Sequence, residues 1–240
     1  MQGASLSGSI ACIGGGGFLM DDARLVQERW ILSLVPEVRR ARPRVLFLGT
    51  AGGDGVVGQL KAYKAFTHLG CEIASLPFFP YEMTRDYAAE ARAADLVYVG
   101  GGNTVAMLAV WREFGFDRAL REAWEGGTVL AGISAGANCW FEHYVTDSVP
   151  GGGIRPGLGW LPGTFCPHLD SEPWRQPMLA AATALPAFGA PEGVVIRFDD
   201  GAMTGAVTDR ETGSAMVRLA GESALRAVPA RALGQATASN

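Results

Sequence analysis

The chain has 240 residues, which is enough for one α/β domain with a substantial core, and its formal net charge is −4. Apolar residues make up 48% and charged residues 18% of the sequence, a balance that excludes a disordered chain and favours a packed globule. The 20 lysines and arginines form no basic run, so neither nucleic acid nor a membrane surface is an expected partner.

In the first half of the chain, short apolar runs alternate with segments of helical periodicity. Strands are expected at 9–13, 44–48, 71–76, 95–99 and 128–133, and helices at 22–38, 56–69, 85–94, 104–114 and 116–124. Repeated strand–helix units with nearly continuous apolar strands predict a single doubly wound α/β domain. Its sheet is expected to be mainly parallel, with helices on both faces.

The second half is less regular. Glycine and proline are frequent between 150 and 163, which predicts a loop-rich segment that contributes to the wall of a site. Strands at 194–198, 202–207 and 215–219 are expected to extend the sheet or form its antiparallel edge. Because residues 221–240 are small and polar, the domain is expected to occupy residues 1–220 and the tail to be poorly ordered.

The N-terminal segment lacks the basic flank and long apolar stretch of a secretion signal or membrane span, which predicts a cytoplasmic protein. The chain has four cysteines, at Cys12, Cys71, Cys139 and Cys166. Their wide spacing fits neither a zinc site nor a disulfide framework. Cys166 precedes Pro167-His168, where a nearby histidine could activate a thiol. With three scattered histidines, no metal or other cofactor is expected.

The sequence Gly132-Ile133-Ser134-Ala135-Gly136 matches the G-x-S-x-G turn that presents a nucleophilic serine between a strand and a helix. The strand expected at 128–133 runs into this turn, and an apolar segment at 135–141 leaves it as the expected helix. Ser134 is therefore the candidate nucleophile, and the N–H of Ala135 is a candidate oxyanion donor. The alternative is that Ser134 only caps the helix.

A second glycine-rich turn, Gly100-Gly101-Gly102-Asn103-Thr104, follows the strand expected at 95–99. In a doubly wound sheet, both turns open on the carboxyl edge where ligands bind. Gly101 and Gly102 are candidates for the remaining oxyanion donors, and Asn103 for a substrate contact. The alternative role of Asn103 is to cap the next helix.

The run Gly14-Gly15-Gly16-Gly17 follows the first expected strand. It does not fit the dinucleotide-binding fingerprint, because Leu19 or Met20 stands where the third glycine or alanine is required. A tight turn at the same edge of the sheet is the preferred interpretation.

Among the histidines, His68 lies near the end of an expected surface helix, and His143 lies too far beyond Ser134 to reach back over the turn. His168 follows Pro167 in a loop and is the preferred general base. Its imidazole needs an orienting carboxylate. Three acidic residues are candidates for that role: Asp170, Glu172 and Glu192.

Four segments, in this order and rough spacing, resemble the peptidase E family: Val99-Gly100-Gly101-Gly102-Asn103-Thr104, Gly132-Ile133-Ser134-Ala135-Gly136-Ala137, Cys166-Pro167-His168 and Pro191-Glu192-Gly193. The resemblance extends from about Gly14 to about Leu219. It implies a fold like that of class I glutamine amidotransferases, with a serine nucleophile in place of cysteine. It also implies Ser134 as nucleophile, His168 as base and Glu192 as the orienting acid.

The family's known activity is cleavage of small peptides, notably dipeptides that begin with aspartate, so a small peptide is the expected substrate. Aspartate-specific members are expected to hold the substrate carboxylate with an arginine in a Gly-Glu-Thr-Arg-like segment. This chain has Ser171-Glu172-Pro173-Trp174-Arg175 there. Arg175 is the candidate clamp, with Asp170 as a further substrate contact, and the alternative for Arg175 is a surface position.

Two other functions stay open. One is a general esterase or amidase that uses the same three residues, and the other is a non-catalytic module that binds a small ligand. A glutamine amidotransferase is disfavoured because Ser134 stands where its cysteine is required and Cys139 lies farther along the helix.

Overall fold

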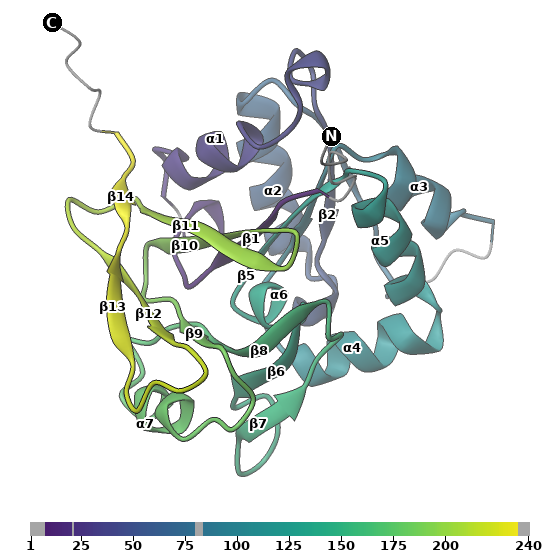
Figure 1. Cartoon of the computed structure of the whole chain (residues 1–240). Coiled ribbons are helices and arrows are strands. Elements are labelled where there is room, and N and C mark those ends of the chain that lie inside the picture. The colour runs from purple at the N-terminus through teal and green to yellow at the C-terminus, as the bar shows by residue number, and fades with distance from the viewer. Residues whose placement is uncertain (1–7, 21, 80–83, 235–240) are drawn as a thin grey trace, which may run out of the picture.

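The computed structural model describes residues 8–20, 22–79 and 84–234, which form two sheets flanked by helices (Figure 1). The larger sheet has eight strands in the order β14-β11-β10-β1-β5-β4-β2-β3. The smaller sheet has six, in the order β13-β12-β9-β8-β6-β7.

The centre of the larger sheet is parallel and carries the glycine-rich turns at its carboxyl edge. Its parallel strands are β1 (Ile10–Ile13), β2 (Arg44–Leu48), β3 (Glu72–Ser75), β4 (Leu96–Val99) and β5 (Val129–Ile133). Val99 of β4 is paired with Gly132 of β5, so the two strands end side by side. β10 (Val194–Asp199) and β11 (Ala202–Thr208) continue the sheet in antiparallel pairs beyond β1, and β14 (Arg231–Ala232) pairs with β11.

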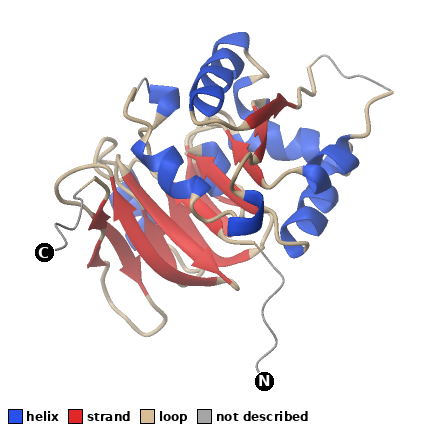
Figure 2. Ribbon diagram, turned by 90° about the horizontal axis from the view of Figure 1, so that it is seen from above, coloured by secondary structure: helices blue, strands red, loops and turns tan. Residues whose placement is uncertain are grey.

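Helices cover both faces of this sheet (Figure 2). The helices α1 (Val26–Leu32) and α2 (Val56–His68) pack on the face to which Ala11 and Ile13 point. The opposite face, with Ile10 and Cys12, is covered by α3 (Tyr87–Ala93), α4 (Thr104–Glu113), α5 (Phe116–Glu125) and α6 (Ala135–Asn138). Successive side chains of each strand point to opposite faces of the sheet, and because these strands are largely apolar, both faces are apolar. The predicted α/β class and parallel-rich sheet are confirmed. Short 3-10 helices lie at Phe18–Met20, Glu37–Arg39 and Thr50–Gly52.

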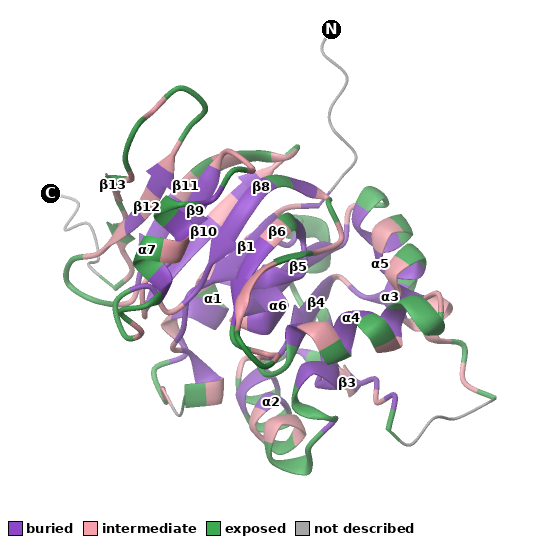
Figure 3. Ribbon diagram, turned by 90° about the horizontal axis from the view of Figure 1, so that it is seen from below, coloured by how far each residue is buried: buried purple, intermediate pink, exposed green. Residues whose placement is uncertain are grey.

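The smaller sheet was not expected from the sequence. Its strands are β6 (Phe141–Thr146), β7 (Gly153–Pro156), β8 (Leu161–Cys166), β9 (Ala187–Gly189), β12 (Ser214–Arg218) and β13 (Arg226–Pro229). It packs on the larger sheet through aromatic rings, and the centroid of Phe198 in β10 lies 5.3 Å from that of Phe141 and 5.0 Å from that of Phe188. On its other side, α7 (Arg175–Ala180) covers a small apolar cluster. Figure 3 shows the buried strands between the more exposed helices.

Several local predictions need correction. The helix expected at 135–141 ends at Asn138, and Phe141 already begins β6. The segment 150–163 contains β7 and the start of β8 rather than only loop. The tail expected to be poorly ordered carries β13 and β14, and its Val228 and Ala230 pack against the core, while residues 235–240 lie outside the described residues. Over the described ranges, no helix is both long and apolar enough to cross a membrane.

Candidate active site

Ser134 occupies the sharp turn between β5 and α6. Its backbone angles are φ 55° and ψ −111°, an unfavourable combination for a residue with a Cβ. The flanking glycines allow this turn. A Cβ on Gly132 would lie 2.1 Å from the carbonyl oxygen of Gly136, and a Cβ on Gly136 would lie 2.3 Å from that of Val99. The turn expected from the sequence is therefore present, with a half-buried Ser134 at its apex.

The glycine turn between β4 and α4 lies beside Ser134. A Cβ on Gly101 would be 3.3 Å from the Cβ of Ser134 and 3.9 Å from its Oγ. Gly102 has φ 136°, and a Cβ there would lie 2.2 Å from the carbonyl oxygen of Ala51, so only glycine fits. In the part of the chain that the structure describes, no protein acceptor binds the N–H groups of Gly101, Gly102 or Ala135. These donors are available to an anionic oxygen.

His168 and Glu192 form a hydrogen-bonded pair. His168 follows β8 with φ 55°, and its Nδ1 lies 2.5 Å from Oε1 of Glu192. This hydrogen bond is the main cause that lowers the pKa of the Glu192 carboxyl below its ordinary value, so the carboxylate is ionised near neutral pH. Ser171 Oγ donates a second hydrogen bond, of 3.1 Å, to the same oxygen.

The end of β1 connects the nucleophile turn to this pair. The carbonyl of Ile13 accepts a hydrogen bond of 3.1 Å from the N–H of Ser134, and the carbonyl of Gly14 accepts one of 3.3 Å from the N–H of His168. Gly15 packs against Glu192, and a Cβ there would lie 1.8 Å from Oε2. Among the hydrogen bonds of the described residues, none joins Ser134 Oγ to the imidazole. The end of β1 therefore supports all three residues, Ser134, His168 and Glu192. The missing hydrogen bond between Ser134 and His168 does not argue against catalysis, because catalytic hydrogen bonds commonly tighten only when substrate binds.

The other two acidic candidates make different contacts. Asp170 Oδ1 accepts a hydrogen bond of 2.7 Å from the N–H of Glu192, and its Oδ2 lies 3.1 Å from Arg210. Glu172 Oε2 accepts hydrogen bonds from Arg175 and Trp174. The carboxylate that contacts His168 is thus that of Glu192. Asp170 holds the backbone of Glu192, and its engaged oxygens do not support the predicted substrate contact.

Arg175 is neither an open clamp nor a surface residue. It is 4% exposed and donates hydrogen bonds to Glu172, to the carbonyl of Val145 and to Asp147. Its guanidinium also lies 4.5 Å from the centroid of the Trp174 ring. Because these partners engage the guanidinium, the geometry argues against the predicted role as a clamp for a substrate carboxylate.

Asn103 takes the alternative role considered from the sequence. Its Oδ1 accepts a hydrogen bond of 2.9 Å from the N–H of Ala106, which caps α4. Its Nδ2 donates a hydrogen bond of 2.9 Å to the carbonyl of Ser148. The amide is therefore occupied, and Asn103 supports the glycine turn instead of presenting a free group to a substrate.

The cysteines are buried and poorly suited to nucleophilic chemistry. Burial raises the pKa of Cys166 to about 12, so its thiol stays protonated although the residue lies two positions before His168. Burial also raises the pKa of Cys139 well above its ordinary value. Within the described ranges, no group of three or more histidine, cysteine, aspartate or glutamate side chains is arranged to hold a metal ion.

The other two histidines lie on other elements. His143 is in β6, in register with Pro156, and His68 ends α2. The sequence did not reveal the supporting roles of Gly15 and Ser171. The run of four glycines was the sequence feature that could have indicated the role of Gly15. No local feature indicates the role of Ser171, because its contact with Glu192 joins residues far apart in the sequence.

A parallel-rich α/β sheet with a strained serine turn, an adjoining glycine turn and a histidine–carboxylate pair at one edge defines a class of hydrolytic enzymes. Residues 10–205 match the model of peptidase family S51. The chain belongs to this family and is a peptidase, which confirms the resemblance seen in the sequence.

Curated relatives agree with this assignment. The chain is 37% identical over 224 residues to the uncharacterized peptidase YgaJ of Bacillus subtilis (strain 168), covering 92% of this chain and 96% of the relative. It is 28% identical over 207 residues to peptidase E of Citrobacter koseri, covering 78% of this chain and 87% of the relative.

Two solved structures have a similar fold. A peptidase from an acI-B1 Actinobacterium aligns with a TM-score of 0.71 and 18% identity, covering 95% of this chain and 96% of that one. A putative peptidase E from Listeria monocytogenes EGD-e aligns with a TM-score of 0.53 and 15% identity, covering 94% and 98%. At such identities these alignments bear on the fold alone.

Proposed function

We propose that this peptidase is a serine enzyme that cleaves small peptides, dipeptides among them, through an acyl-enzyme on Ser134. The observation that carries the proposal is the attachment of the Ser134 turn and the His168–Glu192 pair to consecutive residues at the end of β1. The similarity to a protein named peptidase E supports cleavage of peptides, and the choice of small peptides rests on the family resemblance seen in the sequence.

In the proposed reaction, Ser134 Oγ attacks the carbonyl carbon of the scissile peptide bond while His168 Nε2 takes the hydroxyl proton. Glu192 accepts a hydrogen bond from Nδ1–H, which leaves Nε2 free as the base and stabilises the imidazolium that forms. The N–H groups of Gly101, Gly102 and Ala135 bind the oxyanion of the tetrahedral intermediate.

The imidazolium then donates its proton to the leaving amine as the C–N bond breaks, and the acyl group stays on Ser134. Water attacks the acyl carbon while His168 accepts a proton from it. When the C–O bond to Ser134 breaks, His168 returns the proton to Oγ. No further reactant is needed to balance either half of the reaction.

The test is labelling with a fluorophosphonate probe, followed by mass-spectrometric mapping of the modified residue. We expect label on Ser134, loss of label in Ser134→Ala, and strongly reduced labelling in His168→Gln. The matched control is His143→Gln, which changes a histidine of β6 and is expected to label like the unaltered protein.

Turnover of a dipeptide panel is then compared with turnover of simple esters. Dipeptide hydrolysis that disappears in Ser134→Ala supports the proposal. Ester turnover without dipeptide turnover would instead identify a general esterase. Unimpaired dipeptide turnover by Ser134→Ala would exclude Ser134 as the nucleophile.

A further inference from the structure

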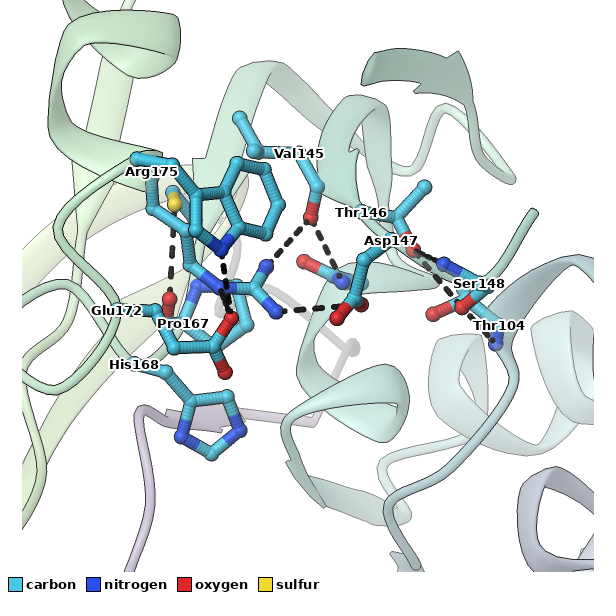
Figure 4. A network of polar contacts seen from close by, with 12 residues as sticks. Thr104, Val145, Thr146, Asp147, Ser148, Pro167, His168, Glu172 and Arg175 are labelled. Carbon is cyan, nitrogen blue, oxygen red and sulfur yellow. Dashed lines mark hydrogen bonds and ion pairs between the residues drawn. The ribbon is translucent and has the colours of Figure 1, made fainter. Parts of the chain in front are cut away.

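Arg175, at the first residue of α7, lies in a polar network between two loops of the site (Figure 4). Its side chain is 5% exposed, so its charge is nearly removed from water. A buried guanidinium is tolerated only when its donors are satisfied. In this network they reach Glu172 at 2.8 Å, and the carbonyl of Val145 and the carboxylate of Asp147 at 3.3 Å each.

On one side the network holds the turn that carries His168. Glu172 donates its backbone N–H to the carbonyl of His168 at 3.1 Å, and its side chain accepts from Arg175 Nε. The backbone N–H of Arg175 also donates to the carbonyl of Glu172 at 3.0 Å. His168 has φ 55°, a conformation that persists only where surrounding contacts determine it. Glu172 and Arg175 supply contacts of this kind.

On the other side the network reaches the glycine turn through the segment that follows β6. Asp147 binds Arg175, and the next residue, Ser148, binds the start of α4. Ser148 Oγ accepts a hydrogen bond of 3.2 Å from the N–H of Thr104, and its carbonyl accepts one of 2.9 Å from Asn103 Nδ2. Asn103 directly follows Gly102, so Ser148 holds the end of the turn that presents the oxyanion donors.

We propose that Arg175 is a positioning residue that sets the placement of the His168 turn relative to the Gly101–Asn103 turn, acting through Glu172 on one side and Asp147–Ser148 on the other. The inference rests on the proposed function, because the two turns carry the general base and the oxyanion donors of the proposed reaction. A guanidinium suits this role because its planar fork reaches several acceptors at once. An ammonium group at the same position lacks that fork.

The first test is Arg175→Lys, which keeps the charge and removes the fork. Enzyme is counted by fluorophosphonate titration of Ser134, so that a loss of folded protein does not imitate a loss of rate. We expect kcat per titrated site to fall by about 10- to 100-fold, since small misplacements of catalytic groups have effects of this size, with KM changed little. The matched control is Arg155→Lys in β7, an exposed arginine expected to keep its kcat.

The second test does not require that the Arg175 variant folds. Glu172→Gln acts on the base side and Ser148→Ala on the oxyanion side, and Arg175 with Asp147 lies between them. We expect the fold-loss of kcat in the variant with both changes to be smaller than the product of the two single fold-losses. The reason is that either change alone already breaks the connection between the His168 turn and the glycine turn. Independent, multiplicative losses would overturn the proposal.

The outcomes separate this inference from the proposed function. A wild-type protein that is folded but never labelled at Ser134 would overturn both. Labelling at Ser134 that depends on His168, together with unchanged kcat per site in Arg175→Lys, would overturn only the positioning role.

Discussion

Gly15 and Glu192 are in direct contact, and a Cβ on Gly15 would lie 1.8 Å from the Oε2 atom of Glu192. The sheet order explains why this contact matters. β1 lies between β5, which leads into Ser134, and β10, which begins just after Glu192. The residues that follow β1 are therefore placed to touch both the nucleophile turn and the acid.

Gly15→Ala is expected to displace the Glu192 carboxylate and lower kcat for peptide hydrolysis by about 100-fold or more, because the imidazole loses its orienting partner. Activity per titrated Ser134 is the measurement. Gly205→Ala is the matched control, since a Cβ at Gly205 meets nothing within 4 Å, and it should leave the rate unchanged. A fully active Gly15→Ala enzyme would contradict the support that we assign to this glycine.

Ser134→Gly is expected to be more stable than Ser134→Ala by about 1 kcal/mol, although both variants lack the nucleophile. The reason is that φ 55° with ψ −111° strains any residue with a Cβ and does not strain glycine. Urea unfolding of the two variants measures the difference. Equal stability, or a more stable alanine variant, would show that the turn stores no strain at this position.

The central strands and both glycine-containing turns were predictable because their signals are local. An apolar strand such as 128–133, followed at once by small residues around Ser134, indicates a strand and a turn without reference to distant residues. The candidate base was also accessible from the sequence, since His168 was the histidine whose loop could face that turn.

The smaller sheet and the role of Arg175 depend on contacts between distant residues. The segment 135–141 has apolar residues suited to a helix, yet Phe141 pairs with Leu161 of β8, and strand pairing of this kind overrides local preference. Likewise, a sequence does not reveal whether an arginine faces substrate or is buried. Arg175 finds Val145 and Asp147 at the end of a strand that the sequence had not predicted.

Thiol reagents are expected to leave the native enzyme active near pH 8. All four cysteines are buried, and burial raises the pKa of Cys71 to about 11 and that of Cys166 to about 12, so very little thiolate is present. Mass spectrometry after iodoacetamide treatment should find alkylation only when the protein is unfolded. Alkylation of Cys166 in the native protein, together with loss of activity, would show that a reactive cysteine lies at the active site.

The Glu192–His168 pair is expected to make stability depend on pH in the acid range. In the folded protein the pKa of Glu192 lies below the ordinary value of a glutamate, chiefly because of the hydrogen bond with His168. The unfolded chain therefore binds a proton more readily, and the stability from this group is complete above the unfolded pKa. It is lost as the pH falls through the ordinary glutamate pKa of about 4.3 and then through the lower folded value.

The measurement is the free energy of urea unfolding between pH 3 and pH 7 for the wild type and Glu192→Gln. We expect the wild type to exceed the variant near neutral pH and the gap to close as the pH falls. Glu211→Gln, which removes an exposed carboxyl outside the pair, should follow the wild type at every pH. His168→Gln removes the main cause of the low pKa, so its acid transition should move to higher pH. A gap between wild type and Glu192→Gln that stays constant over this range would mean that the pair does not stabilise the carboxylate.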